Sequence, residues 1–395
     1  MSKSRNSSVE LLRILSMLFI ICSHFCVHGS FETQEMSFSI NKMVLQIGVL
    51  GNLGVDVFVM ISGYFLSQTD FRISRIVKVM LQVSFYSISI FFILVGLKIV
   101  PFSIKAAIKS IFPVLFNQYW FATTYVVVCF FSPFMNQFLN CLSKRKYLLY
   151  LGTIVIIWSV LPTFTAQSLA SNEFCQFVMF YSVGAYVRKY PSFHFATKNR
   201  YWIVGISAFL LVLSTVFFNL LAINFPVFNH GTYFYSRNSI LIVTLSYGLL
   251  LVFTNMKSIS SMFINSIAST VFGIYLIHDN KYLRPVIWEG ILNVNEYKES
   301  PYLILYLLGC VMLVFTVCAI IDLIRQKLIE KPVLRLIDPL IKWLNKKIYI
   351  IDKNELQNSA SVIAALYPAR SAGAVRSSTI SSVSSSFGCS LSLRL

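Results

Sequence analysis

Long apolar segments recur along the whole chain, separated by short loops that carry most of its polar residues. A helix needs about 20 mostly apolar residues to cross the hydrocarbon core of a bilayer. We therefore predict an all-α, polytopic membrane protein with about ten transmembrane helices, at residues 9–28, 44–66, 76–97, 119–139, 147–164, 174–187, 201–222, 239–255, 262–278 and 301–324. The loops are too short for a soluble catalytic domain, so any chemistry must come from the spans and these loops.

The basic residues orient these spans, because cytoplasmic loops are enriched in Lys and Arg. If the N-terminus is cytoplasmic, the inside segments carry 20 Lys and Arg residues and the outside segments carry 8. The N- and C-termini are therefore both predicted to be cytoplasmic. The segment KIVPFSIKAAIK, residues 98–109, is the exception, with three lysines on the predicted outer face. We expect a short interfacial helix there.

The C-terminal part of the chain changes character after the last span. Residues 331–355 alternate basic and apolar positions, which is typical of an amphipathic segment on the cytoplasmic leaflet. Residues 356–395 are rich in serine, and no acidic residue follows Ser359, so we expect a disordered tail. We divide the chain into a transmembrane domain at 1–330, the amphipathic segment and the tail. Whether the tail is native sequence stays open.

Composition supports a lipid-embedded chain. Of the 395 residues, 56% are hydrophobic and 12% charged, with a mean hydropathy of +0.72, whereas soluble domains carry about 25% charged residues. The net charge of +18 does not indicate a nucleic-acid partner, because the basic residues lie in short clusters that membrane topology explains. The eight cysteines show no metal-ligand spacing, and we expect no metal.

The first span carries ionisable residues, which are costly in lipid and usually face the interior of the bundle. Arg13 and His24 are eleven residues apart, so at about 100° per residue they project from the same face, about 16 Å apart along the axis. His28 continues this face, and Glu10 is close enough to pair with Arg13. The alternatives are a snorkelling anchor for Arg13 and a packing role for His24.

The second span and the loop after it supply further candidates. Asp56 is an acid among apolar neighbours, and Gly54 and Gly63 would permit close helix approach. In FRISR, Arg72 and Arg75 lie about one turn apart at a predicted cytoplasmic entry. Guanidinium groups suit phosphate binding, although positive-inside anchoring explains both arginines equally well.

Two later positions are weaker candidates. Trp120 lies in NQYWFATTYVVV, at a predicted membrane interface where an aromatic belt is the default explanation. His278 ends the ninth span in VFGIYLIHDN, on the same outer side as His24. A histidine at a span boundary is unremarkable by itself.

Taken in order, these motifs resemble the membrane-bound acyltransferase 3 family, which includes O-acetyltransferases of bacterial surface polysaccharides. The matching features are ELLRILSMLFIICSH, GVDVFVMISGYFLS, the FRISR pair, QYWFATTYVVVCFFSPFMN and GIYLIH, over about residues 7–330. The resemblance implies a ten-helix fold, an acyl-CoA donor on the cytoplasmic side and an acceptor near the outer face. It also implies that His24 is catalytic, with Arg13 as its motif partner.

The hypothesis from the sequence is acyl transfer, with acetyl-CoA as the default donor, to a hydroxyl of a cell-surface or lipid-linked polysaccharide at the bacterial plasma membrane. His24 would be the general base, and Arg13, Arg72 and Arg75 would hold the coenzyme A phosphates. Direct transfer and an acyl-enzyme relay both remain open. A glycan polymerase, a flippase or a transporter of the envelope polysaccharide pathway is the alternative.

Overall fold

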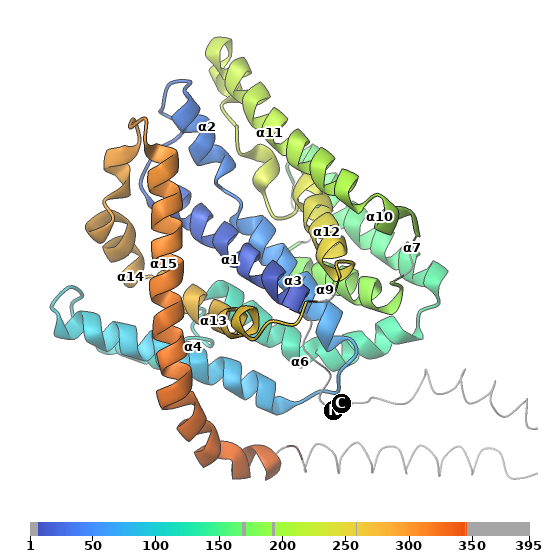
Figure 1. Cartoon of the computed structure of the whole chain (residues 1–395), viewed down its shortest axis with the longest axis vertical. Helices are drawn as coiled ribbons and strands as arrows, with labels where there is room; N and C mark the ends of the chain where they lie inside the picture. The colour runs from blue at the N-terminus through green and yellow to red at the C-terminus, as the bar shows by residue number, and fades with distance from the viewer. Residues whose placement is uncertain (1–6, 168–170, 192–193, 258, 344, 346–395) are drawn as a thin grey trace, which may run out of the picture.

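The computed structural model describes residues 7–167, 171–191, 194–257, 259–343 and 345. Within them every regular element is helical (Figure 1). The α-helices are α1 (Ser7–His28), α2 (Ile40–Ile47), α3 (Gly51–Leu66), α4 (Ile73–Gly96), α5 (Ile104–Ile111), α6 (Trp120–Cys141), α7 (Lys144–Val155), α8 (Leu161–Thr165), α9 (Glu173–Lys189), α10 (His194–Lys198), α11 (Arg200–Asn224), α12 (Ile240–Thr254), α13 (Met262–His278), α14 (Leu283–Pro285) and α15 (Leu303–Arg325). Short π-helical and 3₁₀ turns are η1 (Ile156–Val160), η2 (Pro226–Phe228), η3 (Tyr233–Tyr235), η4 (Val286–Ile291), η5 (Val294–Tyr297) and η6 (Gln326–Glu330).

Each of the ten predicted spans forms a helix or a run of helices, so the predicted all-α polytopic fold is confirmed. In the described part, eight runs are long and apolar enough to cross a membrane. The other two predicted spans are α9 and α13, with 17 residues each. The second span is interrupted between α2 and α3.

The expected short helix in the lysine-containing loop is present as α5. Its position at a membrane surface stays a prediction. The last span continues as a helical run from Leu303 to Trp343, so the described part of the predicted amphipathic segment is helical. The predicted tail, 356–395, lies outside the described residues.

Hydrogen bonds between loops indicate which helix ends lie at the same end of the bundle. At the end where α1 begins, the Ser7 backbone N–H donates to the Ile259 carbonyl, 2.9 Å away, and Lys189 Nζ donates to the Leu139 carbonyl at 2.9 Å. All four residues lie near loops that were predicted inside. We call this face the N-terminal end of the bundle.

The opposite end collects the loops that were predicted outside. Asn41 Nδ2 donates to the Lys298 carbonyl at 2.9 Å, and the Tyr233 hydroxyl donates to the Thr163 carbonyl at 2.8 Å. Each of these contacts, at either end, joins two segments that the loop charges assigned to the same side. Which face is cytoplasmic stays a prediction from those charges.

Helix α1 lies at the centre of the molecule, in contact with α3, α12, α13 and α15 (Figure 1). Its Leu12, Ile21 and Phe25 side chains are fully buried. The ionisable residues of α1 consequently face protein on several sides, which is the setting that a charged residue in a span requires.

Close helix approach at Gly54 and Gly63 is confirmed. A Cβ atom on Gly54 would collide with the Ser16 carbonyl of α1, and one on Gly63 with the Tyr181 carbonyl of α9. Gly184 of α9 is similarly pressed against the Met60 carbonyl of α3. Helix α3 thus packs closely against α1 on one side and α9 on the other, as small residues allow in membrane bundles.

Candidate active site

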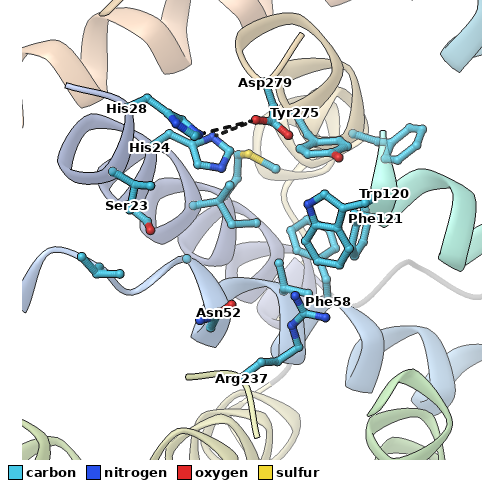
Figure 2. A pocket seen from close by; sticks show the side chains of 17 residues that line it. Ser23, His24, His28, Asn52, Phe58, Trp120, Phe121, Arg237, Tyr275 and Asp279 are labelled. Atoms are coloured by element: carbon cyan, nitrogen blue, oxygen red, sulfur yellow. Dashed lines mark ion pairs between the residues drawn. The ribbon is translucent and has the colours of Figure 1, made fainter. Parts of the chain in front are cut away.

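A cavity of about 320 Å³ opens between α1, α3, α6 and α13, towards the end opposite the N-terminal end (Figure 2). Its wall is largely apolar, with a few polar groups that converge on it, as is usual for small-molecule sites. The polar and aromatic lining residues include Ser23, His24, His28, Asn52, Trp120, Arg237, Tyr275 and Asp279.

His24 and His278 are in direct contact. His24 Nδ1 lies 3.0 Å from His278 Nε2, and His278 Nδ1 lies 2.6 Å from the Ile274 carbonyl, one turn back on α13. The His278 side chain is fully buried. The structure therefore brings together two histidines that are 254 residues apart in the sequence.

These contacts determine which ring nitrogen carries the proton in each neutral histidine. A carbonyl oxygen can only accept, so His278 Nδ1 must donate to Ile274, and His278 Nε2 is left as an acceptor. His24 Nδ1 must then donate to His278. His24 Nε2 keeps its lone pair, and it has no hydrogen-bond partner among the described residues.

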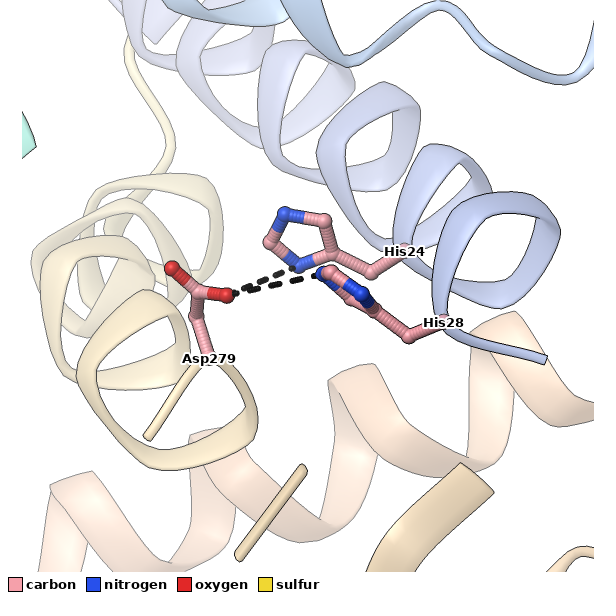
Figure 3. A group of neighbouring side chains, drawn as sticks. All are labelled: His24, His28 and Asp279. Carbon is pink, nitrogen blue, oxygen red and sulfur yellow. Dashed lines mark ion pairs between the residues drawn. The ribbon is translucent and has the colours of Figure 1, made fainter. Parts of the chain in front are cut away.

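Asp279, directly after α13, faces both histidines of α1 (Figure 3). Its Oδ1 lies 3.7 Å from His24 Nδ1 and 4.0 Å from His28 Nε2. The same oxygen accepts a hydrogen bond from an Arg284 guanidinium nitrogen at 2.7 Å. Burial raises the pKa of the Asp279 carboxyl, and Arg284 acts against that shift. The Arg284 guanidinium therefore stabilises the ionised carboxylate of Asp279 beside the histidines.

His24, His28 and Asp279 also form a group that could hold a metal ion, since each offers one ligand atom within 4.8 Å of the others. Two imidazoles and a carboxylate suit zinc. However, Asp279 Oδ1 already contacts the Arg284 guanidinium, whose positive charge would oppose a cation on that oxygen. His24 Nδ1 is likewise committed to His278. These two contacts oppose a cation at this position, and the expectation of no metal stays a prediction.

The predicted Glu10–Arg13 pair is confirmed, with an Arg13 Nη to Glu10 Oε2 distance of 2.8 Å. The Arg13 guanidinium also lies over the Phe65 ring, 5.6 Å from its centroid. Among the described residues, the cavity lining on α1 runs from His28 to Met17. Arg13 lies one helical turn beyond that limit. The shared passage from Arg13 to His24 therefore stays a prediction.

Arg72 and Arg75 lie at the N-terminal end of the bundle, at the turn between α3 and α4. Arg72 is exposed and precedes the first residue of α4. An Arg75 Nη donates to Thr69 Oγ1 at 2.9 Å and to the Asp70 carbonyl at 3.2 Å, so Arg75 stabilises the turn. Neither arginine lines the cavity around His24.

Asp56 and Trp120 were also candidates from the sequence, and of the two only Trp120 lines the cavity. Asp56 is fully buried, and neither of its carboxylate oxygens has a hydrogen-bond partner in the part of the chain that the structure describes. Trp120 lines the cavity, and the Arg237 guanidinium lies over its indole, with Cζ 4.2 Å from the ring centroid. Trp120 thus lines the cavity and packs against Arg237, neither of which a membrane-interface position would require.

Sequence reasoning did not select Asp279, Arg284 or Arg237 as site residues. Asp279 follows the GIYLIH motif directly and Arg284 lies six residues after its histidine, so charged residues soon after an apolar span that ends in histidine were a usable signal. Arg237 carried no such signal, because in the sequence it is one basic residue in an outer loop. Only the fold of the loop before α12 brings it to Trp120.

Comparison with known proteins agrees with these observations. A family model of an acyltransferase domain matches residues 6–323 of the chain. The match includes α1, the cavity and most of α15. No curated protein and no solved structure gives a significant match.

Proposed function

The chain belongs to the acyltransferase 3 family, and on that basis we propose that it transfers an acyl group, acetyl by default, from acyl-CoA to a saccharide hydroxyl. The acceptor in this proposal is a cell-surface or lipid-linked polysaccharide, and the location is the bacterial plasma membrane. Membership of the family supports a membrane acyltransferase in general. The donor, the acceptor and the residue roles are the proposal.

One observation carries the proposal: the hydrogen-bonded chain from Ile274 through His278 to His24 leaves a lone pair on His24 Nε2. A neutral imidazole of this tautomer is a general base that needs no rearrangement before it accepts a proton. His278 holds the ring through its other nitrogen, as the third group does in other nucleophile–base pairs.

The reaction balances with this one base. The acceptor hydroxyl oxygen forms a bond to the thioester carbonyl carbon while its proton moves to His24 Nε2. The tetrahedral intermediate then collapses, the C–S bond breaks, and the His24 proton passes to the departing thiolate. The products are the O-acyl saccharide and free coenzyme A, and His24 returns to its starting tautomer.

Asp279 would stabilise the transient imidazolium. Its Oδ1 is 3.7 Å from His24 Nδ1, within the range over which an opposite charge favours the charged form of a base. Because the Arg284 guanidinium contacts the same oxygen, its positive charge balances the Asp279 carboxylate before the reaction begins.

Coenzyme A would approach from the N-terminal end of the bundle, where Arg13, Arg72 and Arg75 are found. Arg13 pairs with Glu10 and lies over the Phe65 ring near the end of α3, and Arg75 lies in the first turn of α4, just after the turn that follows α3. Guanidinium groups at this end of the bundle suit a phosphate-binding mouth. The acyl arm would then extend along α1 towards His24.

Substituting His24 tests this proposal. We expect His24→Ala to lower acetyl transfer by about 100-fold or more, because general-base catalysis is lost, while the protein still inserts and elutes as a single species. Transfer would be measured as release of coenzyme A thiol and as acetyl mass on the glycan. His230→Ala is the matched control, since His230 is exposed at the same end of the molecule and does not line the cavity. Full transfer by a folded His24→Ala protein would contradict the proposal.

A further inference from the structure

Arg237 occupies the side of the cavity across from the histidines. Figure 2 shows its guanidinium next to Trp120 and Phe58, with Asn52 beside it, while His24, His28 and Asp279 lie at the other end. The loop that carries Arg237 is fixed by Asn52, whose Nδ2 donates to the Tyr235 carbonyl at 2.8 Å. The position of Arg237 is therefore set by the fold and by its packing on the indole.

The guanidinium has no hydrogen bond or ion pair among the described residues, and its buried Nε lacks a partner. This distinguishes Arg237 from Arg13, which pairs with Glu10, and from Arg284, which pairs with Asp279. A partly buried guanidinium with free N–H donors is costly unless something in the cavity accepts from it.

Two acidic residues offset the positive charge of Arg237 but accept no hydrogen bond from its N–H groups. Asp56 and the exposed Glu173 both act electrostatically on Arg237, yet neither forms an ion pair with it. Trp120 covers one face of the guanidinium. The N–H groups along the edge of the planar guanidinium stay available, and their spacing matches the two oxygens of a carboxylate or phosphate.

We infer that Arg237 binds an anionic oxygen group on the acceptor, so that the acceptor is an acidic saccharide that carries a carboxylate or a phosphate. This inference depends on the proposed function for the identity of the ligand as an acceptor. Because the histidines lie across the cavity, the group bound by Arg237 is not the reacting hydroxyl. Arg237 selects and positions the acceptor, and His24 acts on a hydroxyl at the other end of the bound sugar.

The test is direct binding of simple sugars to the purified full-length protein in lipid nanodiscs, without acetyl-CoA. The probes are glucuronic acid, glucose 6-phosphate and glucose. Tryptophan fluorescence is the readout, because the guanidinium contacts Trp120, and a Trp120→Phe protein identifies the part of the signal that comes from that residue.

We expect at least one acidic sugar to bind about tenfold or more tightly than glucose, which is the usual scale for a charge-assisted hydrogen bond. Arg237→Gln should abolish the preference, and Arg237→Lys should restore part of it, since Lys keeps the charge but not the fork. Arg188→Gln is the matched control: Arg188 also packs on an aromatic ring, that of Tyr64 at 5.0 Å, but does not line the cavity. The relative affinity of the two acids tells carboxylate from phosphate.

An equal or undetectable response to all three sugars would overturn the inference, as would a preference that persists in Arg237→Gln. Because the assay contains no acyl donor, that failure would leave the proposed acyl transfer standing. Conversely, retained transfer by His24→Ala would remove the proposed chemistry without affecting the measured preference for anionic sugars.

Discussion

In the proposed reaction His278 is a positioning residue, because it contacts His24 and does not itself line the cavity. Its Nδ1 is held by the Ile274 carbonyl, so its Nε2 can only accept from His24. A merely structural histidine at this buried position would affect stability but would not select the tautomer of its neighbour.

We therefore expect His278→Ala to lower kcat by about tenfold or more through loss of the reactive His24 tautomer, with little change in KM for acetyl-CoA. His278→Gln should recover part of kcat, since the glutamine carbonyl oxygen can accept from His24 Nδ1. Steady-state kinetics on both proteins, with elution volume as a check on folding, measure this. Wild-type kcat in both variants would show that His24 does not depend on His278.

At the scale of the helices, the site depends on how closely α3 packs against its neighbours. Asn52 on α3 lines the cavity, and α3 contacts α9 through backbone at Gly63 and Gly184. The interface has no room for a methyl group there. This close packing holds α3, which forms one wall of the cavity, against α9.

Gly63→Ala is accordingly expected to destabilise the protein by about 1–3 kcal/mol through overpacking. Gly309→Ala is the matched control, because Gly309 is also in a span helix, α15, and a Cβ there meets no atom within 4 Å. Thermal unfolding midpoints in the same detergent compare the two variants. Equal midpoints for Gly63→Ala and the parent protein would contradict the close contact of α3 with α9.

At the scale of the whole molecule, the orientation of the bundle in the bilayer is a prediction that labelling can test. Loop contacts separate the two ends of the bundle, and the excess of Lys and Arg assigns the N-terminal end to the cytoplasm. The proposed donor and acceptor sides both follow from that assignment.

Cysteine labelling tests the predicted orientation. Glu299→Cys should react with a membrane-impermeant maleimide in intact cells, whereas Arg145→Cys should react only after permeabilisation, each compared with the parent protein. Both positions are exposed, at opposite ends of the bundle. The reverse labelling pattern would place acyl-CoA and acceptor on the wrong sides for the proposed reaction.

The sequence alone determined the helices, their alternation and the candidate role of His24. Span length and helical period depend on local spacing, so ten apolar segments and one shared face for Arg13 and His24 can be derived without knowing how the helices pack. The Glu10–Arg13 pair and the glycines that admit close packing were predictable for the same reason.

Tertiary structure alone decided the partners of those residues. His24 meets His278 and Asp279 because α1 packs beside α13, and Arg237 meets Trp120 because a loop before α12 folds onto the start of α6. Such contacts join segments more than 100 residues apart. Their formation depends on the packing of whole helices, which no local pattern of hydrophobic and polar residues encodes.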